Sequence, residues 1–313
     1  MEATLRALVA AVRGGADAAT QAAAAAALPA LALAMLATAL PTLLALTLGG
    51  LTAPYGKYAA SSEARLFGPL VDGRLAWVVQ ELPSLVLPPL LWLRAAPAAR
   101  PALLGSERGV LLLLFCAHYL NRTLVFPLRL RGGKPTPLGV AAMAFAFTTW
   151  NGLMQGLALT LGGEAGAGGD GDILAPRFVL GVCLFVAGAG INLHADHVLR
   201  TLRAPGETGY RIPRGGAFEL VSGANFFGEM VEWTGFAVAA WGVPHARLPA
   251  LAFAAFTACN IGPRGVQHHV SSRGWRAAGG ARKLREARRP GRTLGSAPAL
   301  VCACACACAT TVP

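Results

Sequence analysis

Long apolar segments separated by short polar ones recur along the whole chain. Each apolar segment approaches or exceeds the roughly 18 residues that indicate a membrane-spanning helix, and the polar side chains inside several of them return with helical spacing. The segments predict helices at about 24–50, 76–93, 109–128, 138–161, 178–198, 218–241 and 245–262. The pattern therefore predicts an all-α membrane protein, a bundle of seven transmembrane helices.

The composition supports a membrane protein. The chain is 55% hydrophobic and 13% charged, and its mean hydropathy is +0.52. These values lie far from those of an average soluble domain. The net charge of +12 does not indicate nucleic-acid binding, because residues 270–313 contain eight Lys/Arg and one Glu and so supply much of it. We predict no nucleic-acid partner, and we expect the basic face of the body to attract anionic membrane lipids or a phosphorylated cofactor.

The distribution of Lys and Arg predicts the orientation. These residues are denser in the loops around 57–74, 129–134 and 200–214 and in the C-terminal tail than in the alternate loops. The denser loops should be cytosolic, so the N-terminus is expected in the lumen and the C-terminus in the cytosol. The first apolar segment is too long for a cleaved signal peptide and is expected to be a retained signal-anchor helix.

The chain divides into two predicted parts, a seven-span domain at 1–269 and a basic, low-complexity tail at 270–313. The tail has no apolar period, and its Cys-Ala alternation at 302–309 fits no zinc spacing. We predict no metal site. The composition of the tail is typical of a disordered segment, as intron read-through or alternative splicing would produce.

Ionisable residues inside apolar helices are costly, and they usually line a cavity or a site. Glu81 lies deep in the segment 76–93, although pairing with a basic residue to hold two helices together is an alternative reading. In the segment 109–128, His118 and Tyr119 precede Arg122 by four and three residues, so these side chains can share one helical face. A buried phenol is a good donor to a carbonyl oxygen that gains charge, and a guanidinium suits a phosphate or a carboxamide.

Two further polar stripes lie on consecutive segments. Asn192, Asp196 and Arg200 recur at intervals of four, with Arg203 beyond them, and the next segment repeats the pattern. Its members are Asn225, Glu229 and Glu232. The two stripes could line one cleft open to the cytosol, or they could act as glue between helices. Two motif matches are expected to be coincidental, namely a glycosylation sequon at 121–123 and a GxGxxG pattern at 166–171 that no strand precedes.

Three sequence motifs carry a resemblance to a known family. WVVQELPSL at 77–85, RGGKPTP at 131–137 and the stretch 192–233 closely resemble the steroid 5α-reductases, the type 1 members most of all. The resemblance implies a seven-helix bundle in the endoplasmic reticulum membrane, with NADPH as cofactor and a steroid substrate that enters from the lipid phase. It also implies hydride transfer to C5 and protonation at C4 of a 3-oxo-Δ4-steroid such as testosterone or progesterone.

The resemblance implies roles for individual residues. Glu81 and Tyr119 match the catalytic pair that hydrogen-bonds the steroid C3 carbonyl. The residues that match the cofactor contacts are Trp77, Arg122, Arg131, Asn151, Asn192, Asp196, Arg203, Tyr210, Asn225, Glu229, Arg264 and His268.

The chain also departs from the family. Asn121 stands where the family usually has His, and Ala175 stands near a usual acidic residue. Gly262-Pro263 is expected to break the end of the last span, and the sequence after His269 replaces an aromatic-rich segment. The alternatives to the steroid reductase are a catalytically impaired isoform of it, and a related enzyme of the same bundle acting on a polyprenol, an enoyl thioester or a prenylated cysteine.

Overall fold

The structure is a computed structural model, and it describes residues 18–48, 67–95, 100–130, 134–161, 171–203 and 211–277. These residues are helical almost throughout. The elements are α2 (Ala18–Thr47), α3 (Gly73–Arg94), α4 (Glu107–Leu120), η4 (Asn121–Val125), α5 (Phe126–Arg129), α6 (Leu138–Thr160), α7 (Pro176–Thr201), η5 (Gly216–Glu219), α8 (Ala224–Ala240) and α9 (Arg247–Ala277). A two-stranded antiparallel ladder joins β1 (Leu70–Val71) to β2 (Thr136–Pro137), with Leu70 opposite Pro137.

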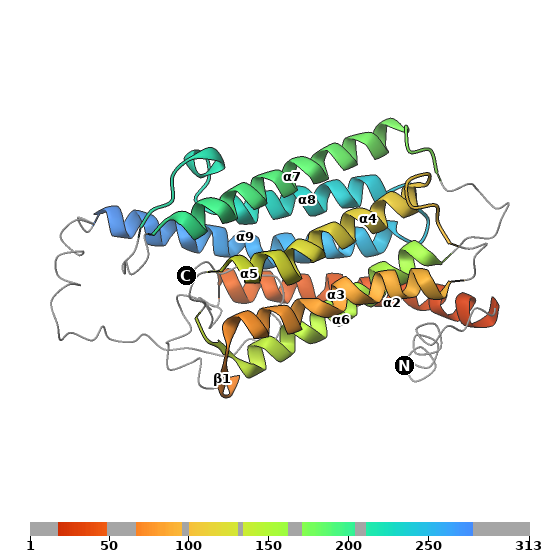
Figure 1. The fold of residues 1–313 in the computed structure, drawn as a ribbon, viewed down its shortest axis with the longest axis horizontal. Helices are drawn as coiled ribbons and strands as arrows, with labels where there is room; N and C mark the ends of the chain where they lie inside the picture. Colours follow the sequence, from red (N-terminus) through yellow and green to blue (C-terminus); the bar gives the residue numbers. More distant parts are fainter. Residues whose placement is uncertain are drawn as a thin grey trace.

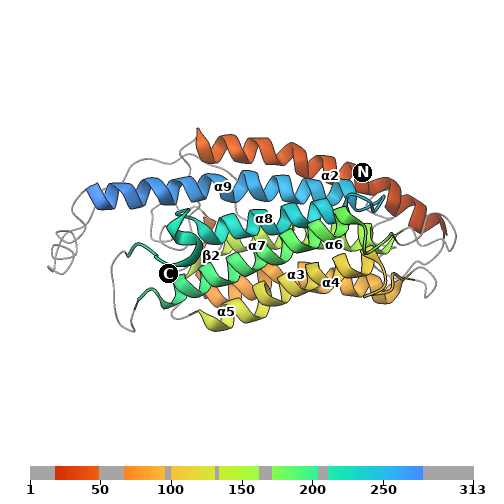
Figure 2. The same ribbon diagram turned by 90° about the horizontal axis from the view of Figure 1, so that it is seen from above.

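The long helices lie side by side along the long axis of the molecule (Figure 1). α7 packs on α8, α3 packs on α6, and α2 packs on α9 at one side of the bundle, as the view from above shows (Figure 2). α8 also contacts α9, and α4 contacts α3, α6 and α8. α4 therefore links the α3–α6 pair to the α7–α8 pair.

Glycines allow two of these helix pairs to approach very closely. A Cβ atom added at Gly188 of α7 would meet the backbone nitrogen of Glu232, and one added at Gly228 of α8 would meet the backbone of Asn192. On α6, Gly152 faces the backbone of Pro83 and Ser84 of α3 in the same way. Small residues at such contacts let backbones pack directly, which is how helices associate where water does not drive them together.

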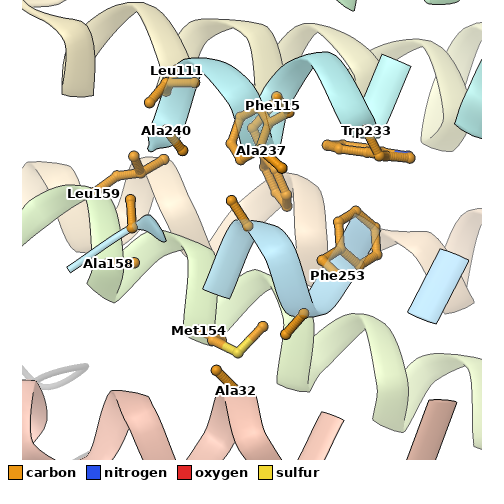
Figure 3. Close-up of a cluster of buried hydrophobic side chains, with 14 of the residues drawn as sticks. Ala32, Leu111, Phe115, Met154, Ala158, Leu159, Trp233, Ala237, Ala240 and Phe253 are labelled. Carbon is orange, nitrogen blue, oxygen red and sulfur yellow. The ribbon is translucent and has the colours of Figure 1, made fainter. Parts of the chain in front are cut away.

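A core of aromatic and aliphatic side chains fills the space between the pairs. Phe115 of α4, Trp233 of α8 and Phe253 of α9 converge in the interior, and Met154 and Ala32 close it from α6 and α2 (Figure 3). The Trp233 and Phe253 rings meet edge to face with centroids 4.5 Å apart. The same helices also carry polar side chains that face the interior, and this packing holds those helices in place.

Every helical segment expected from the apolar pattern is present in the described residues. Four helical segments are long and apolar enough to cross a membrane, judged by length and composition. They are Ala19–Thr47, Gly73–Arg94, Glu107–Arg129 and Pro176–Thr201. The chain is thus a mostly helical protein of membrane type. The other long helices, α6, α8 and α9, are not among the four; α6 and α9 carry several buried polar side chains, and α8 is only 17 residues long.

Three helix predictions need correction. The expected helix at 218–241 is two elements, because the chain leaves helical geometry before α8, where Gly223 has φ −117° and ψ 59°. The last helix does not end at 262, since α9 continues through Pro263 to Ala277. Its extension is held by a Gln267 hydrogen bond to the Leu46 carbonyl and by contact between Ser222 and His269. The segment 109–128 is interrupted by one π-helical turn, η4, a feature that often marks functional sites.

Candidate functional site

Tyr119 lies at the centre of the polar interior. Its side chain is 2% exposed, and its hydroxyl oxygen accepts a hydrogen bond from Asn151 Nδ2 at 3.1 Å. The Phe115 ring lies 4.7 Å away and the Trp233 ring 6.2 Å away, centroid to centroid. The phenol is therefore buried against aromatic rings, with Asn151 bonded to its oxygen.

Arg122, in the π-helical turn, is the shared cation of this interior. Its guanidinium lies 3.5 Å from Asp196 Oδ2 and stacks over the Trp77 ring at 5.1 Å. Trp77 Nε1 donates to the Arg122 carbonyl at 2.8 Å, so the predicted cofactor contacts Trp77, Arg122 and Asp196 form one cluster. The guanidinium also interacts electrostatically with Glu81 and Glu229.

Three buried carboxyl groups interact electrostatically with this guanidinium. Glu81, Asp196 and Glu229 are 4%, 1% and 2% exposed. Gln80 donates to Glu81 Oε1 at 3.3 Å, whereas both Asp196 oxygens and Glu229 Oε2 have no hydrogen-bond partner among the described residues. Buried polar groups are rarely left without hydrogen bonds unless a ligand or water supplies them. These oxygens are acceptors, so they fit a ligand that brings hydroxyl or amide donors.

The two predicted polar stripes do face each other. Asn192 Nδ2 of α7 donates to the Asn225 carbonyl of α8 at 2.9 Å, directly beside the glycine contact of these helices. Glu232, one turn further, pairs with His118 of α4, with Nδ1 and Oε1 2.8 Å apart. The sequence predicted that His118 shares one helical face with Arg122, but its hydrogen-bond partner, Glu232, lies on α8.

The remaining predicted cofactor contacts lie in the second half of α9 and just after the end of α7. Arg264 is buried and donates to Asn260 Oδ1 at 2.9 Å, and it interacts electrostatically with Glu229. His268 is half-buried with its ring 5.7 Å from Phe226, and Arg203 is half-buried just after α7. Arg131 and Tyr210 lie outside the described residues, as does most of the GxGxxG segment.

Sequence reasoning missed several buried polar residues of this interior. Gln155 donates to Asn151 Oδ1 and to the Pro249 carbonyl, and the Thr148 hydroxyl donates to the Gln80 carbonyl. Gln155 follows Asn151 by four residues, and Thr148 precedes it by three, so the helical period that revealed the other stripes also contains these residues. The stripes predicted from the sequence each contain charged residues, whereas Thr148, Asn151 and Gln155 are all uncharged.

An open cavity of about 500 Å³ lies elsewhere, between the start of α7 and the facing surfaces of α8 and α9. Alanine side chains, Thr234 and Trp241 line most of it, and Arg177 stands at its rim. No predicted site residue lines this cavity, so it is separate from the polar interior.

The chain is similar in sequence to a family of known steroid dehydrogenases. Residues 134–274 match the family model described as 3-oxo-5-alpha-steroid 4-dehydrogenase. The 3-oxo-5-alpha-steroid 4-dehydrogenase 1 of Bos taurus is 47% identical over 234 residues, which cover 75% of this chain and 86% of the relative. The type 1 and type 2 proteins of Homo sapiens are both 46% identical, over 69% of this chain and 77% and 79% of their own lengths. The resemblance predicted from the motifs is confirmed.

Proposed function

The chain belongs to the 3-oxo-5-alpha-steroid 4-dehydrogenase family of oxidoreductases, and from this premise we propose that it reduces the 4,5 double bond of 3-oxo-Δ4-steroids to 5α-steroids, with NADPH as reductant. Testosterone and progesterone are the expected substrates. The relatives are named for this reaction and cover most of the chain. The observation that carries the proposal is the buried Tyr119 hydroxyl, whose oxygen accepts a hydrogen bond from Asn151.

Tyr119 and Glu81 act on the substrate carbonyl. When C5 gains a hydride, negative charge moves through the conjugated system onto the C3 oxygen and forms an enolate. Hydrogen bonds from Tyr119 and Glu81 to that oxygen would stabilise the charge, and in a site from which water is excluded they would do so strongly. Protonation at C4 then returns the ketone.

The buried residues around Arg122 fit the cofactor. The oxygens of Asp196 and Glu229 that accept no hydrogen bond within the described residues would accept from the ribose hydroxyls or the carboxamide of NADPH. Arg122 and Arg264 would face its anionic groups. When bound, NADPH supplies the hydride. The other residues assigned to its binding are Trp77, Arg131, Asn151, Asn192, Arg203, Tyr210, Asn225 and His268.

The protein is placed in the endoplasmic reticulum membrane, with seven spans, a lumenal N-terminus and a cytosolic C-terminus. Seven helical segments support this assignment. α6 and α9 join the four apolar spans because buried polar residues lower their average hydropathy, and the 17 residues of α8 lie at the lower end of the length that can span a bilayer. Steroid substrates then reach the site from the lipid phase.

The test is NADPH-dependent reduction of testosterone and progesterone by membranes that contain the full chain. Tyr119→Phe should lower kcat by about 10²–10³-fold, as expected for removal of one donor to a developing oxyanion, and Glu81→Met, which removes the carboxyl group, should lower it by a similar factor. Thr149→Val, on the opposite face of α6, is the control and should retain activity. A second chain, in which the residues after His269 are replaced by those of a type 1 relative, separates the alternatives. Activity in this chain alone would identify the present form as an impaired isoform, and inactivity of both inserted chains would favour another lipid substrate.

A further inference from the structure

Three helices contribute to one line of hydrogen bonds behind Tyr119. Asn151 and Gln155 of α6 are one turn apart, and both are fully buried. Gln155 Nε2 donates to the Pro249 carbonyl of α9 at 2.9 Å and to Asn151 Oδ1 at 3.4 Å, and Asn151 Nδ2 donates to the Tyr119 hydroxyl at 3.1 Å. The line therefore begins at a backbone carbonyl and ends at the phenol.

The direction of every bond in this line is fixed by its first member. A backbone carbonyl can only accept, so Gln155 must present its NH2 group to Pro249. The same group faces Asn151 Oδ1, which turns the Asn151 NH2 group toward Tyr119. Gln155 Oε1 is buried without a hydrogen-bond partner among the described residues. The Gln155 amide thus keeps this orientation although its buried oxygen accepts no hydrogen bond from the described residues, and a buried acceptor without a partner costs free energy.

The consequence is a defined role for the phenol. A phenolic oxygen has one proton to donate and can also accept. Because Asn151 fills the accepting position, the O–H group of Tyr119 must point away from α6. The rings of Phe115 and His118, at 4.7 and 5.1 Å, restrict rotation of the Tyr119 ring, so the hydroxyl keeps its place.

We propose that Asn151 and Gln155 are positioning residues that hold Tyr119 as a hydrogen-bond donor to the substrate carbonyl. This inference rests on the proposed function, since it presumes that the carbonyl of a 3-oxo-Δ4-steroid meets Tyr119. It gives Asn151 a second role beside the proposed cofactor contact, and it assigns a role to Gln155, which no motif predicted. A donor that is already oriented needs no reorganisation when charge develops on the carbonyl oxygen.

Two near-isosteric changes reverse the direction of the line. Asn151→Asp places an acceptor against the phenol, so that the Tyr119 O–H turns toward α6. Gln155→Glu removes the donor that orients Asn151. Each should lower kcat by about 10–100-fold, the range typical of groups that orient a ligand-binding residue, with KM nearly unchanged. Thr149→Val is the matched control on α6.

The decisive measurement is the C=O stretching frequency of a 3-oxo-Δ4-steroid labelled with ¹³C at C3 and bound to the purified full chain, recorded by infrared difference spectroscopy. Hydrogen bonding from Tyr119 lowers this frequency, so Tyr119→Phe should raise it. Asn151→Asp and Gln155→Glu should raise it toward the Tyr119→Phe value, and Thr149→Val should not change it.

An unchanged frequency in both amide variants would overturn the positioning role. If Tyr119→Phe itself leaves the frequency unchanged, the proposed contact between Tyr119 and the carbonyl is wrong, and this outcome is distinct from failure of the positioning role alone. Should a charged variant not accumulate in membranes, Gln155→Met provides the same test, because it keeps the length of the side chain and lacks the donor.

Discussion

Replacing Arg122 tests whether one guanidinium balances the buried carboxyl groups. In Arg122→Met the side chain keeps much of its apolar volume and loses its charge. At 3.5 Å from Asp196, and with an effective dielectric constant of about 20, the lost attraction is about 5 kcal/mol. Removal of one partner of a buried pair typically costs about 3–5 kcal/mol, because the other charge stays buried without compensation. We expect a loss of that size in the free energy of unfolding.

The measurement is a denaturant titration of the purified chain in mixed micelles, followed by tryptophan fluorescence, without ligand. Asp196→Asn added to Arg122→Met should recover about 1–3 kcal/mol, because the two changes couple through the same contact. Arg129→Met, at the exposed end of the same segment, should stay within about 0.5 kcal/mol of the unaltered chain. The reasoning is refuted if Arg122→Met behaves like Arg129→Met, or if the losses of the double variant simply add.

The other predictions concern helix contacts. Gly228→Ala should lower the free energy of unfolding by at least about 2 kcal/mol, because the new Cβ meets backbone atoms of α7. Gly190 faces open space, so Gly190→Ala should leave the free energy of unfolding unchanged in the same titration. Glu232→Gln should lower the free energy of unfolding by about 1–3 kcal/mol, because it weakens the contact between α4 and α8. Adding His118→Gln to this variant should lower it little further. If the losses of the two single variants add fully, the two side chains do not interact. Glu107→Gln should cost about 1–3 kcal/mol, since Glu107 is fully buried and accepts two hydrogen bonds from Arg177, and a melting temperature equal to that of the unaltered chain would argue against this estimate.

Much of the fold could be predicted because the signal was local. The apolar runs located every long helix, and the spacing of Asn192 and Asp196 placed their side chains on the buried face of α7. The two facing stripes were likewise predicted from their four-residue intervals, and the contact between Asn192 and the Asn225 carbonyl agrees with that prediction.

The features that could not be predicted depend on contacts between distant segments. The π-helical turn carries Arg122 beside Asp196, and nothing in the residues 121–125 alone specifies its extra hydrogen-bonded ring. The pairing of His118 with Glu232 joins residues 114 positions apart. The continuation of α9 past Pro263 depends on its packing against α2, which local helix-breaking tendencies do not include.

The glycine contacts between α7 and α8 have a consequence at the level of the gene. Every missense change at a glycine codon introduces a residue with a Cβ atom, and at Gly188 or Gly228 that atom would overlap the backbone of the neighbouring helix. No amino-acid replacement at these two codons is therefore conservative. In a population survey of coding variation, or in a saturation mutagenesis screen for activity, these codons should be depleted of missense variants as strongly as those of Glu81 and Tyr119, although no glycine side chain takes part in the chemistry.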